Sequence, residues 1–124
     1  MVAFKENNKS IFLQIADMVC EDILAGRLKG GQRMLSVREC AGEMEVNVNT
    51  VMRSYEYLAQ QGVIFNRRGI GFFVAEDAAE VISNRRRSEF LEGEMSDVFR
   101  QLYLLNVTPE QLTAMYKEYI SKIK

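Results

Sequence analysis

Apolar residues recur at helical spacing near the start of the chain. They occur every fourth position from Ile11 to Ile23, which predicts a helix over residues 10–25 with one apolar face. Ser10 can cap the start of this helix. Gly26 can adopt the left-handed conformation that commonly ends one.

Two further short helices follow, and each has a start signal. Ser36 and Glu39 have the spacing of a capping box, which predicts a second helix that ends near Met44. Asn47 can cap a third helix that runs to about Gln60. Two short helices joined by a tight turn form a helix-turn-helix, whose second helix enters a DNA groove. The buried stripe of this helix is expected to comprise Val51, Tyr55, Leu58 and Ala59.

The next segment has the pattern of a β-hairpin. Residues 63–67 and 72–74 are rich in β-branched and aromatic side chains, and they flank a basic turn with two glycines at 68–71. A hairpin directly after a helix-turn-helix is a wing. Residues 33–35 are long enough for only a short strand.

From residue 77 onward the pattern is purely helical. A helix can run from 77 to 105, with Gly93 able to bend it, and Thr108 with Pro109 marks the start of a last helix. Two such helices cannot bury their apolar stripes against each other alone, so association with a second copy is expected. The residues expected at this interface are Leu91, Met95, Val98, Phe99, Leu102, Leu112, Met115, Tyr116 and Tyr119.

The sequence therefore predicts a mainly α-helical protein with a small β-hairpin (α+β). Its first part, residues 1–76, is a winged helix-turn-helix DNA-binding domain. Its second part, residues 77–124, is a two-helix dimerisation segment.

Composition narrows the possible functions. The chain has 16 basic and 17 acidic residues, so any affinity for DNA must come from the placement of charge and not from the total. Histidine is absent, which excludes Ser-His-Asp and Cys-His catalysis by this chain. With no metal-ligand spacing and no phosphate-binding loop, we expect neither an enzyme nor a metal or other cofactor. The two cysteines, Cys20 and Cys40, lie in helical stretches and are expected to be buried thiols.

No apolar run approaches the length of about 20 residues that a membrane helix needs. The first ten residues have no apolar core of signal-peptide length. We therefore expect a cytoplasmic protein that does not associate with membranes.

Polar residues gather at the start of the third helix. Asn49 and Thr50 suit contacts with phosphates or base edges, whereas Asn47 serves equally well as a simple cap. Arg53, one turn later, is either a DNA contact or a solvated charge. Arg38 is poorly placed for the dipole of the second helix, which favours a functional role. The alternative for Arg38 is an ion pair with Glu39 or Glu43.

The predicted wing is basic at its tip. Arg67 and Arg68 suit a minor groove or its flanking phosphates, and Gly69 and Gly71 allow positive φ and close approach of the backbone. A second basic run, residues 85–87, is interpreted as a solvated helix face.

The stretch Ser10–Val74 resembles the GntR family of bacterial regulators. The run VNVNTVMRSY and the short helical tail are similar to the YtrA subfamily, which pairs a winged helix-turn-helix with a short dimerisation segment. The chain departs from many relatives at Leu35, where they have proline, and at Val48 and Met52, where they have arginines that read bases. The resemblance implies DNA contact at Ser36, Arg38, Asn47, Asn49, Thr50, Arg53, Arg67, Arg68, Gly69 and Gly71.

Taken together, these features predict a sequence-specific transcription regulator. It would bind a palindromic double-stranded DNA operator as a homodimer, with the recognition helix in the major groove and the wing at the minor groove. Repression is implied by the resemblance alone, and a small-molecule effector remains open. The alternative is a winged-helix module that docks proteins without reading DNA, which the near-neutral charge would suit better.

Overall fold

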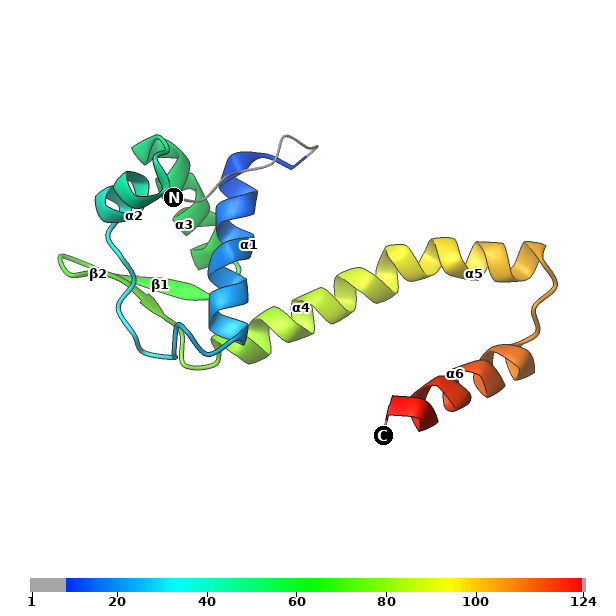
Figure 1. The fold of residues 1–124 in the computed structure, drawn as a ribbon. Helices are drawn as coiled ribbons and strands as arrows, with labels where there is room; N and C mark the ends of the chain where they lie inside the picture. Colours follow the sequence, from blue (N-terminus) through cyan, green and yellow to red (C-terminus); the bar gives the residue numbers. More distant parts are fainter. Residues whose placement is uncertain (1–8, 124) are drawn as a thin grey trace. The chain divides into compact units, whose positions relative to one another are not determined.

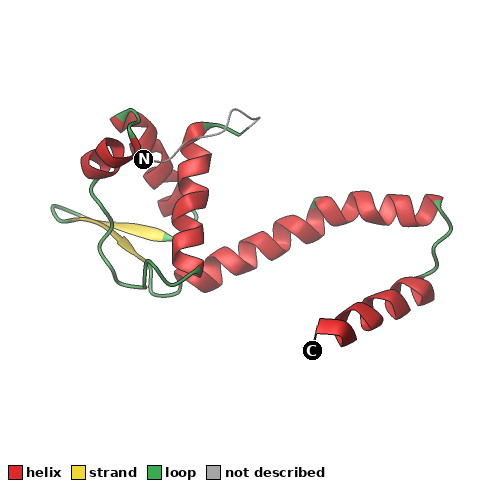
Figure 2. Ribbon diagram, in the orientation of Figure 1, coloured by secondary structure: helices red, strands yellow, loops and turns green. Residues whose placement is uncertain are grey.

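Six helices and two strands follow one another in the part of the chain that the structure, a computed structural model, describes, residues 9–123. The chain divides into two compact units, with Asn84 the last residue of the first and Arg85 the first of the second. Figures 1 and 2 show the elements in order. They are α1 (Ile11–Leu24), α2 (Val37–Met44), α3 (Val48–Gln60), β1 (Ile64–Arg67), β2 (Gly71–Val74), α4 (Ala78–Glu92), α5 (Glu94–Leu104) and α6 (Pro109–Ile123). The predicted fold class, mainly helical with one β-hairpin, is confirmed.

Helix α1 has nearly the predicted bounds, but its first turn is not capped in the predicted way. Ser10 occupies the capping position with an extended backbone, yet its side chain makes no capping hydrogen bond. Instead the Ser10 carbonyl accepts the Gln14 amide at 3.1 Å, so the backbone alone begins the helix. The prediction of a side-chain cap was therefore wrong. Gly26 has a φ of +82°, as the predicted helix end requires.

Helices α2 and α3 begin as predicted. The Ser36 hydroxyl accepts the Glu39 amide at 3.1 Å, and the Glu39 carboxylate accepts the Ser36 amide at 2.9 Å, which completes the capping box. The turn between the helices passes through Glu45 in the left-handed conformation, with a φ of 55°. Asn47 then caps α3, because its side-chain oxygen accepts the Asn49 amide at 2.7 Å.

The hairpin is antiparallel, and its paired residues run from Ile64 with Val74 to Arg67 with Gly71. The short strand predicted over residues 33–35 is reduced to one bridge, between Arg33 and Phe73. The backbone beside it is also attached to β2, since the Met34 amide donates to the Phe72 carbonyl at 2.8 Å. The segment before α2 thus lies against the wing and fixes one of its edges.

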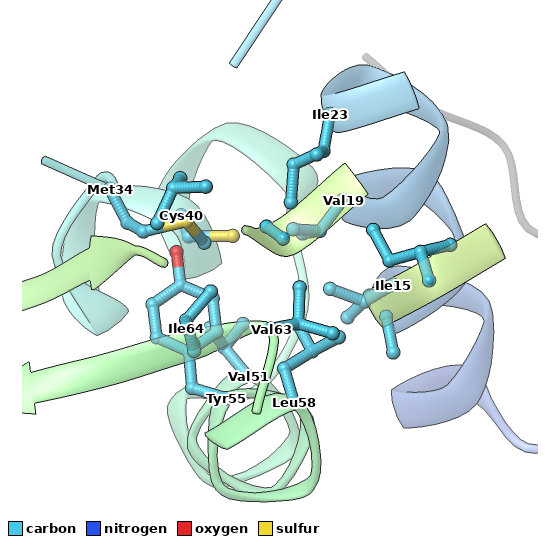
Figure 3. Packing of buried hydrophobic residues seen from close by; sticks show 14 of the residues in the cluster. Ile15, Val19, Ile23, Met34, Cys40, Val51, Tyr55, Leu58, Val63 and Ile64 are labelled. Atoms are coloured by element: carbon cyan, nitrogen blue, oxygen red, sulfur yellow. The ribbon is translucent and has the colours of Figure 1, made fainter. Parts of the chain in front are cut away.

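A single apolar core holds α1, α3 and the hairpin together, as Figure 3 shows. The predicted stripe of α3 is confirmed: three of its four residues are fully buried, and Ala59 packs at the edge of the core. Each large aliphatic side chain buried in this way contributes about 1.5–3 kcal/mol. The core residues contributed by α1 and α3 include Ile15, Ala16, Val19, Ile23, Val51, Tyr55 and Leu58.

Tyr55 connects three elements at the centre of this core. Its ring meets Phe72 of β2 edge-on, with centroids 5.1 Å apart. Its hydroxyl donates to the Leu35 carbonyl at 2.8 Å, which ties α3 to the segment before α2. Burial raises the pKa of the Tyr55 hydroxyl, so it remains a donor at every physiological pH.

The two cysteines are free thiols. Cys40 is buried, as predicted, and Cys20 is half-buried against the core. Burial is the main cause that raises the pKa of the Cys40 thiol, which therefore stays protonated and unreactive at neutral pH.

The helical segment predicted over residues 77–124 differs from the prediction at Gly93. The helix expected over residues 77–105 ends at Glu92 and restarts at Glu94, so the tail has three helices where two were predicted. A Cβ atom on Gly93 would lie only 2.8 Å from the Glu89 carbonyl oxygen, so the break needs glycine. Beyond the break, the Ser96 amide donates to the Gly93 carbonyl at 3.0 Å and begins the new helix.

Helix α6 begins at the predicted place. The Thr108 hydroxyl accepts the Gln111 amide at 3.1 Å, and the Gln111 side chain accepts the Thr108 amide at 2.8 Å. No helix in the described part of the chain is long and apolar enough to cross a membrane.

The contact between Tyr55 and Leu35 gives a test of the core. We expect Tyr55→Phe to lower the free energy of unfolding by about 1–2 kcal/mol, because the Leu35 carbonyl loses its donor inside the fold. Urea denaturation of the full chain measures this change. The matched control is Tyr57→Phe, which keeps the ring that contacts Phe12. Equal losses in the two variants would contradict the assigned role.

Candidate nucleic-acid interface

The start of α3 presents polar side chains to the outside. Asn47 and Asn49 are exposed and Thr50 is half-buried. The capping bond of Asn47 uses only its side-chain oxygen, which leaves both amide hydrogens for an outside acceptor. The capping role of Asn47 is therefore confirmed and is compatible with a DNA contact, which stays a prediction for all three residues.

The two faces of α3 differ in burial. The face toward the core is closed by Val51, Ser54 and Tyr55. The outer face carries Val48 and Met52, each about two-fifths exposed. Apolar groups of this size suit the methyl group of thymine in a major groove.

Arg38 is exposed in the first turn of α2. The alternative ion pair with Glu39 is absent, because the Glu39 carboxylate is held in the capping box. Within residues 9–123, no acidic side chain pairs with Arg38, and this includes Glu43. Its charge is therefore available to an external anion. Ser36, the residue that caps the same helix, is half-buried.

Arg53 is exposed but not freely solvated. The centre of its guanidinium group lies 4.0 Å from the centroid of the Phe12 ring on α1, a cation–π contact. The Phe12 ring in turn meets Tyr57 edge-on at 6.0 Å. Sequence reasoning missed Phe12, because only the fold brings α1 beside this part of α3.

The wing carries its charge at the tip. Arg67 lies over the Phe73 ring at 5.3 Å, and Phe73 stacks on Phe65 across the hairpin at 5.9 Å. Arg68 is exposed in the turn that follows. Both predicted glycines have positive φ, +79° at Gly69 and +140° at Gly71, which only glycine adopts readily.

Arg33 is a further basic residue at the wing that sequence reasoning missed. Its guanidinium donates to the Ile70 carbonyl at 2.8 Å. Residue 33 and residue 70 are far apart in the sequence, so no local pattern indicates the contact.

The apolar residues predicted for the dimer interface are exposed or half-buried in the single chain. Helices α5 and α6 bury no residue. Tyr103, outside the predicted set, is 83% exposed, the most of any large apolar residue of the described chain. Of the predicted set, Met95, Leu102 and Leu112 are half-buried, and the exposed members are Leu91, Val98, Phe99, Met115, Tyr116 and Tyr119.

The described part of the chain holds no group of three or more His, Cys, Asp or Glu side chains able to bind a metal ion. Its chemistry is that of amides, hydroxyls and guanidinium groups around α2, α3 and the wing. Such groups bind phosphates and base edges. Together with the order of the helices and the hairpin, this surface defines a protein of the winged helix-turn-helix class.

Comparison with known proteins identifies the family. The model of the "Bacterial regulatory proteins, gntR family" matches residues 12–74, and the chain belongs to this family. The HTH-type transcriptional regulator YhcF of Bacillus subtilis is 34% identical, over 92% of this chain and 93% of YhcF. The HTH-type transcriptional repressor YtrA of the same organism is 31% identical, over 92% of this chain and 87% of YtrA.

A crystal structure of a GntR-family transcriptional regulator from Bacteroides thetaiotaomicron is 49% identical, with a TM-score of 0.79. The match covers 93% of this chain and all of that chain. All three relatives are named as transcription regulators. They span the tail as well as the winged helix, which supports the resemblance to the YtrA subfamily.

The capping box predicts a pH dependence. The amide of Ser36 is the main cause that lowers the pKa of Glu39, and the Ser36 side chain adds to it. A lowered pKa in the folded state stabilises the fold above the ordinary value of 4.5, and this contribution is lost as the pH falls below it. We therefore expect Glu39→Gln to destabilise the protein at pH 7 and to differ less from the wild type as the pH falls below 4.5.

Thermal unfolding followed by circular dichroism at several pH values measures this difference. Glu43→Gln on the same helix is the control for loss of one charge. A difference between wild type and Glu39→Gln that stays constant with pH would refute the role of the ionised carboxylate.

Proposed function

We propose that this chain is a repressor that binds a palindromic operator as a homodimer. Its recognition helix α3 enters the major groove, and its wing contacts the adjacent minor groove. The observation that carries the proposal is that α3 has one face fixed in the core and Asn47 and Asn49 exposed at its amino end, while Arg38 is exposed on α2. A helix with a fixed inner face and an exposed polar amino end is what groove recognition requires.

The contacts divide into two kinds. Asn49, Thr50 and the free amide of Asn47 contact base edges or phosphates at the amino end of α3, where backbone amides also favour anions. Arg38 and Arg53 bind phosphates and fix the register of α3 in the groove. Ser36 holds the start of α2 in place for Arg38. In the wing, Arg67 and Arg68 reach the minor groove while Gly69 and Gly71 let the backbone approach.

Dimerisation uses the apolar surface of α5 and α6. Exposed apolar patches of this extent mark interaction sites, and a second copy covers them with the same surface. A twofold pair places two recognition helices about 34 Å apart, one turn of DNA. The winged helix over residues 1–76 then reads DNA, and residues 77–124 join the two copies.

Repression has one line of support. The relative YtrA is named a repressor, and the match spans nearly the whole of both chains. A dimer bound at its operator represses most simply by occupying that site. We place the protein in the cytoplasm, where its DNA is, and assign it no catalytic role.

In vitro selection of bound DNA by the full chain tests the proposal. We expect an inverted repeat whose half-sites are centred about one helical turn apart. Binding to the selected DNA by fluorescence anisotropy then gives the affinity. If no sequence is enriched and salt removes all binding, the chain has only a non-specific attraction for DNA. This outcome would overturn the proposal.

Arg38→Ala gives a residue-level test on the selected DNA. We expect affinity to fall about 10- to 100-fold, or about 1.4–2.8 kcal/mol, because a charge-assisted hydrogen bond to DNA is lost. The control is Arg87→Ala, which removes an exposed arginine of α4 from the run interpreted as a solvated helix face. Equal effects of the two changes would contradict the assignment of Arg38.

Phe99→Asp tests the dimer. Phe99 is half exposed in the single chain, and symmetry would place the new carboxylate in the interface twice. We expect the dimer to weaken at least about 100-fold, or about 3 kcal/mol, since a buried charge without a partner is costly. Sedimentation equilibrium measures this against Gln101→Asp, an exposed polar position of α5 outside the predicted set. A dimer that survives Phe99→Asp unchanged would exclude this surface.

A further inference from the structure

Arg33 connects the wing to the segment that leads into α2. Its Nη2 atom donates to the Ile70 carbonyl at 2.8 Å, and its backbone bridges to Phe73. The paired part of the hairpin ends at Arg67 and Gly71, so Ile70 lies in the turn beyond it. Arg33 therefore binds the wing at its tip, beyond the last residue pair of the two strands.

Gly71 leaves the space that the Arg33 side chain occupies. A Cβ atom at residue 71 would lie 3.3 Å from the Arg33 Nε atom and 3.4 Å from Nη2, so the Arg33 side chain would have to shift by a few tenths of an ångström. Gly71 also has a φ of +140°. A glycine at this position thus serves the turn and admits the guanidinium group beside it.

The other end of this connection is rigid. The Met34 amide is bonded to Phe72, and the Leu35 carbonyl is held by the buried Tyr55. The Ser36 amide is the main cause that lowers the pKa of Glu39, and the charge of Arg33 adds a smaller effect in the same direction. Arg33 thus lies close enough to the start of α2 to act on its capping box.

From these contacts we infer that Arg33 is a positioning residue that holds the wing tip at a fixed place relative to the start of α2. An isolated two-stranded hairpin is only marginally stable, and a mobile wing would lose entropy on binding. With Arg33 in place, the wing arginines and Arg38 meet one DNA site in a single arrangement. This inference rests on the proposed function, in which the wing and α2 contact the same operator.

The first test needs no DNA. Backbone ¹⁵N relaxation of the full chain is compared between wild type and Arg33→Met, which keeps an unbranched apolar side chain and removes the guanidinium group. We expect order parameters at residues 68–71 to fall from about 0.85 toward 0.6 while those of α3 stay unchanged. Unchanged order at the wing tip would overturn the inference, and this outcome is independent of whether the protein binds any operator.

The second test separates positioning from simple charge. Arg33→Met and Arg68→Ala are measured singly and together on DNA selected by the wild type. We expect each to weaken binding about tenfold and the pair to weaken it clearly less than the product, because Arg68 contributes little once the wing is loose. A loss equal to the product would show that Arg33 acts as an independent charge and would overturn the inference.

Arg33→Met combined with Arg53→Ala is the control cycle. Arg53 is on α3 and lies against Phe12 of α1, away from the contact between Arg33 and the wing, so the two losses should multiply. Failure of the wild type to bind any selected DNA would refute the proposed function instead, and the relaxation measurement would still decide whether Arg33 orders the wing.

Discussion

Burial of one face of α3 against α1 is the constraint on which the rest of the first unit depends. Val51, Tyr55 and Leu58 are almost completely inaccessible, and Ser54 lies among them with its hydroxyl oxygen unpaired within the described structure. Because this face is fixed in the core, the amino end and the outer side of α3 have a single orientation toward solvent. The polar residues there are therefore held in place before any ligand arrives.

The same core also fixes the elements on either side of α3. Tyr55 contacts Phe72 of β2 through its ring and the Leu35 carbonyl before α2 through its hydroxyl. One side chain therefore fixes the positions of both β2 and this segment relative to α3. Phe12 then holds Arg53 from the α1 side, and Arg33 holds the wing tip. Each exposed basic group that is fixed in this way contacts a half-buried aromatic ring or a backbone carbonyl. Such attachment lowers the entropy lost when a side chain binds a phosphate.

Sequence reasoning succeeded where the signal is local. The capping boxes at Ser36 and Thr108, the cap at Asn47 and the left-handed Gly26 all depend on residues within three or four positions of one another. It failed where the cause lies elsewhere in the chain. Phe12 beneath Arg53 and Arg33 at Ile70 are contacts between distant segments, and nothing in their own neighbourhoods distinguishes them from ordinary surface residues. The break at Gly93 was foreseen only as a bend, because the close approach of the Glu89 carbonyl, which leaves no room for a Cβ atom at residue 93, appears only in three dimensions. The roles of the candidate DNA-contact and dimer residues stay predictions.

Because the net charge of the chain is near zero, the pairing of two copies through the second unit matters for DNA affinity. With 16 basic and 17 acidic residues, the chain as a whole has no electrostatic attraction for DNA, and affinity rests on the few arginines around α2, α3 and the wing. Each phosphate contact releases counterions, so affinity rises steeply with the number of contacts made at once. One copy offers about five such arginines, and a dimer presents twice that number for a single loss of translational freedom. A tail that buries none of the residues of α5 and α6 by itself is therefore consistent with a protein whose DNA affinity depends on pairing. In such a protein, any influence that changes the pairing of the tails also changes occupancy of the DNA.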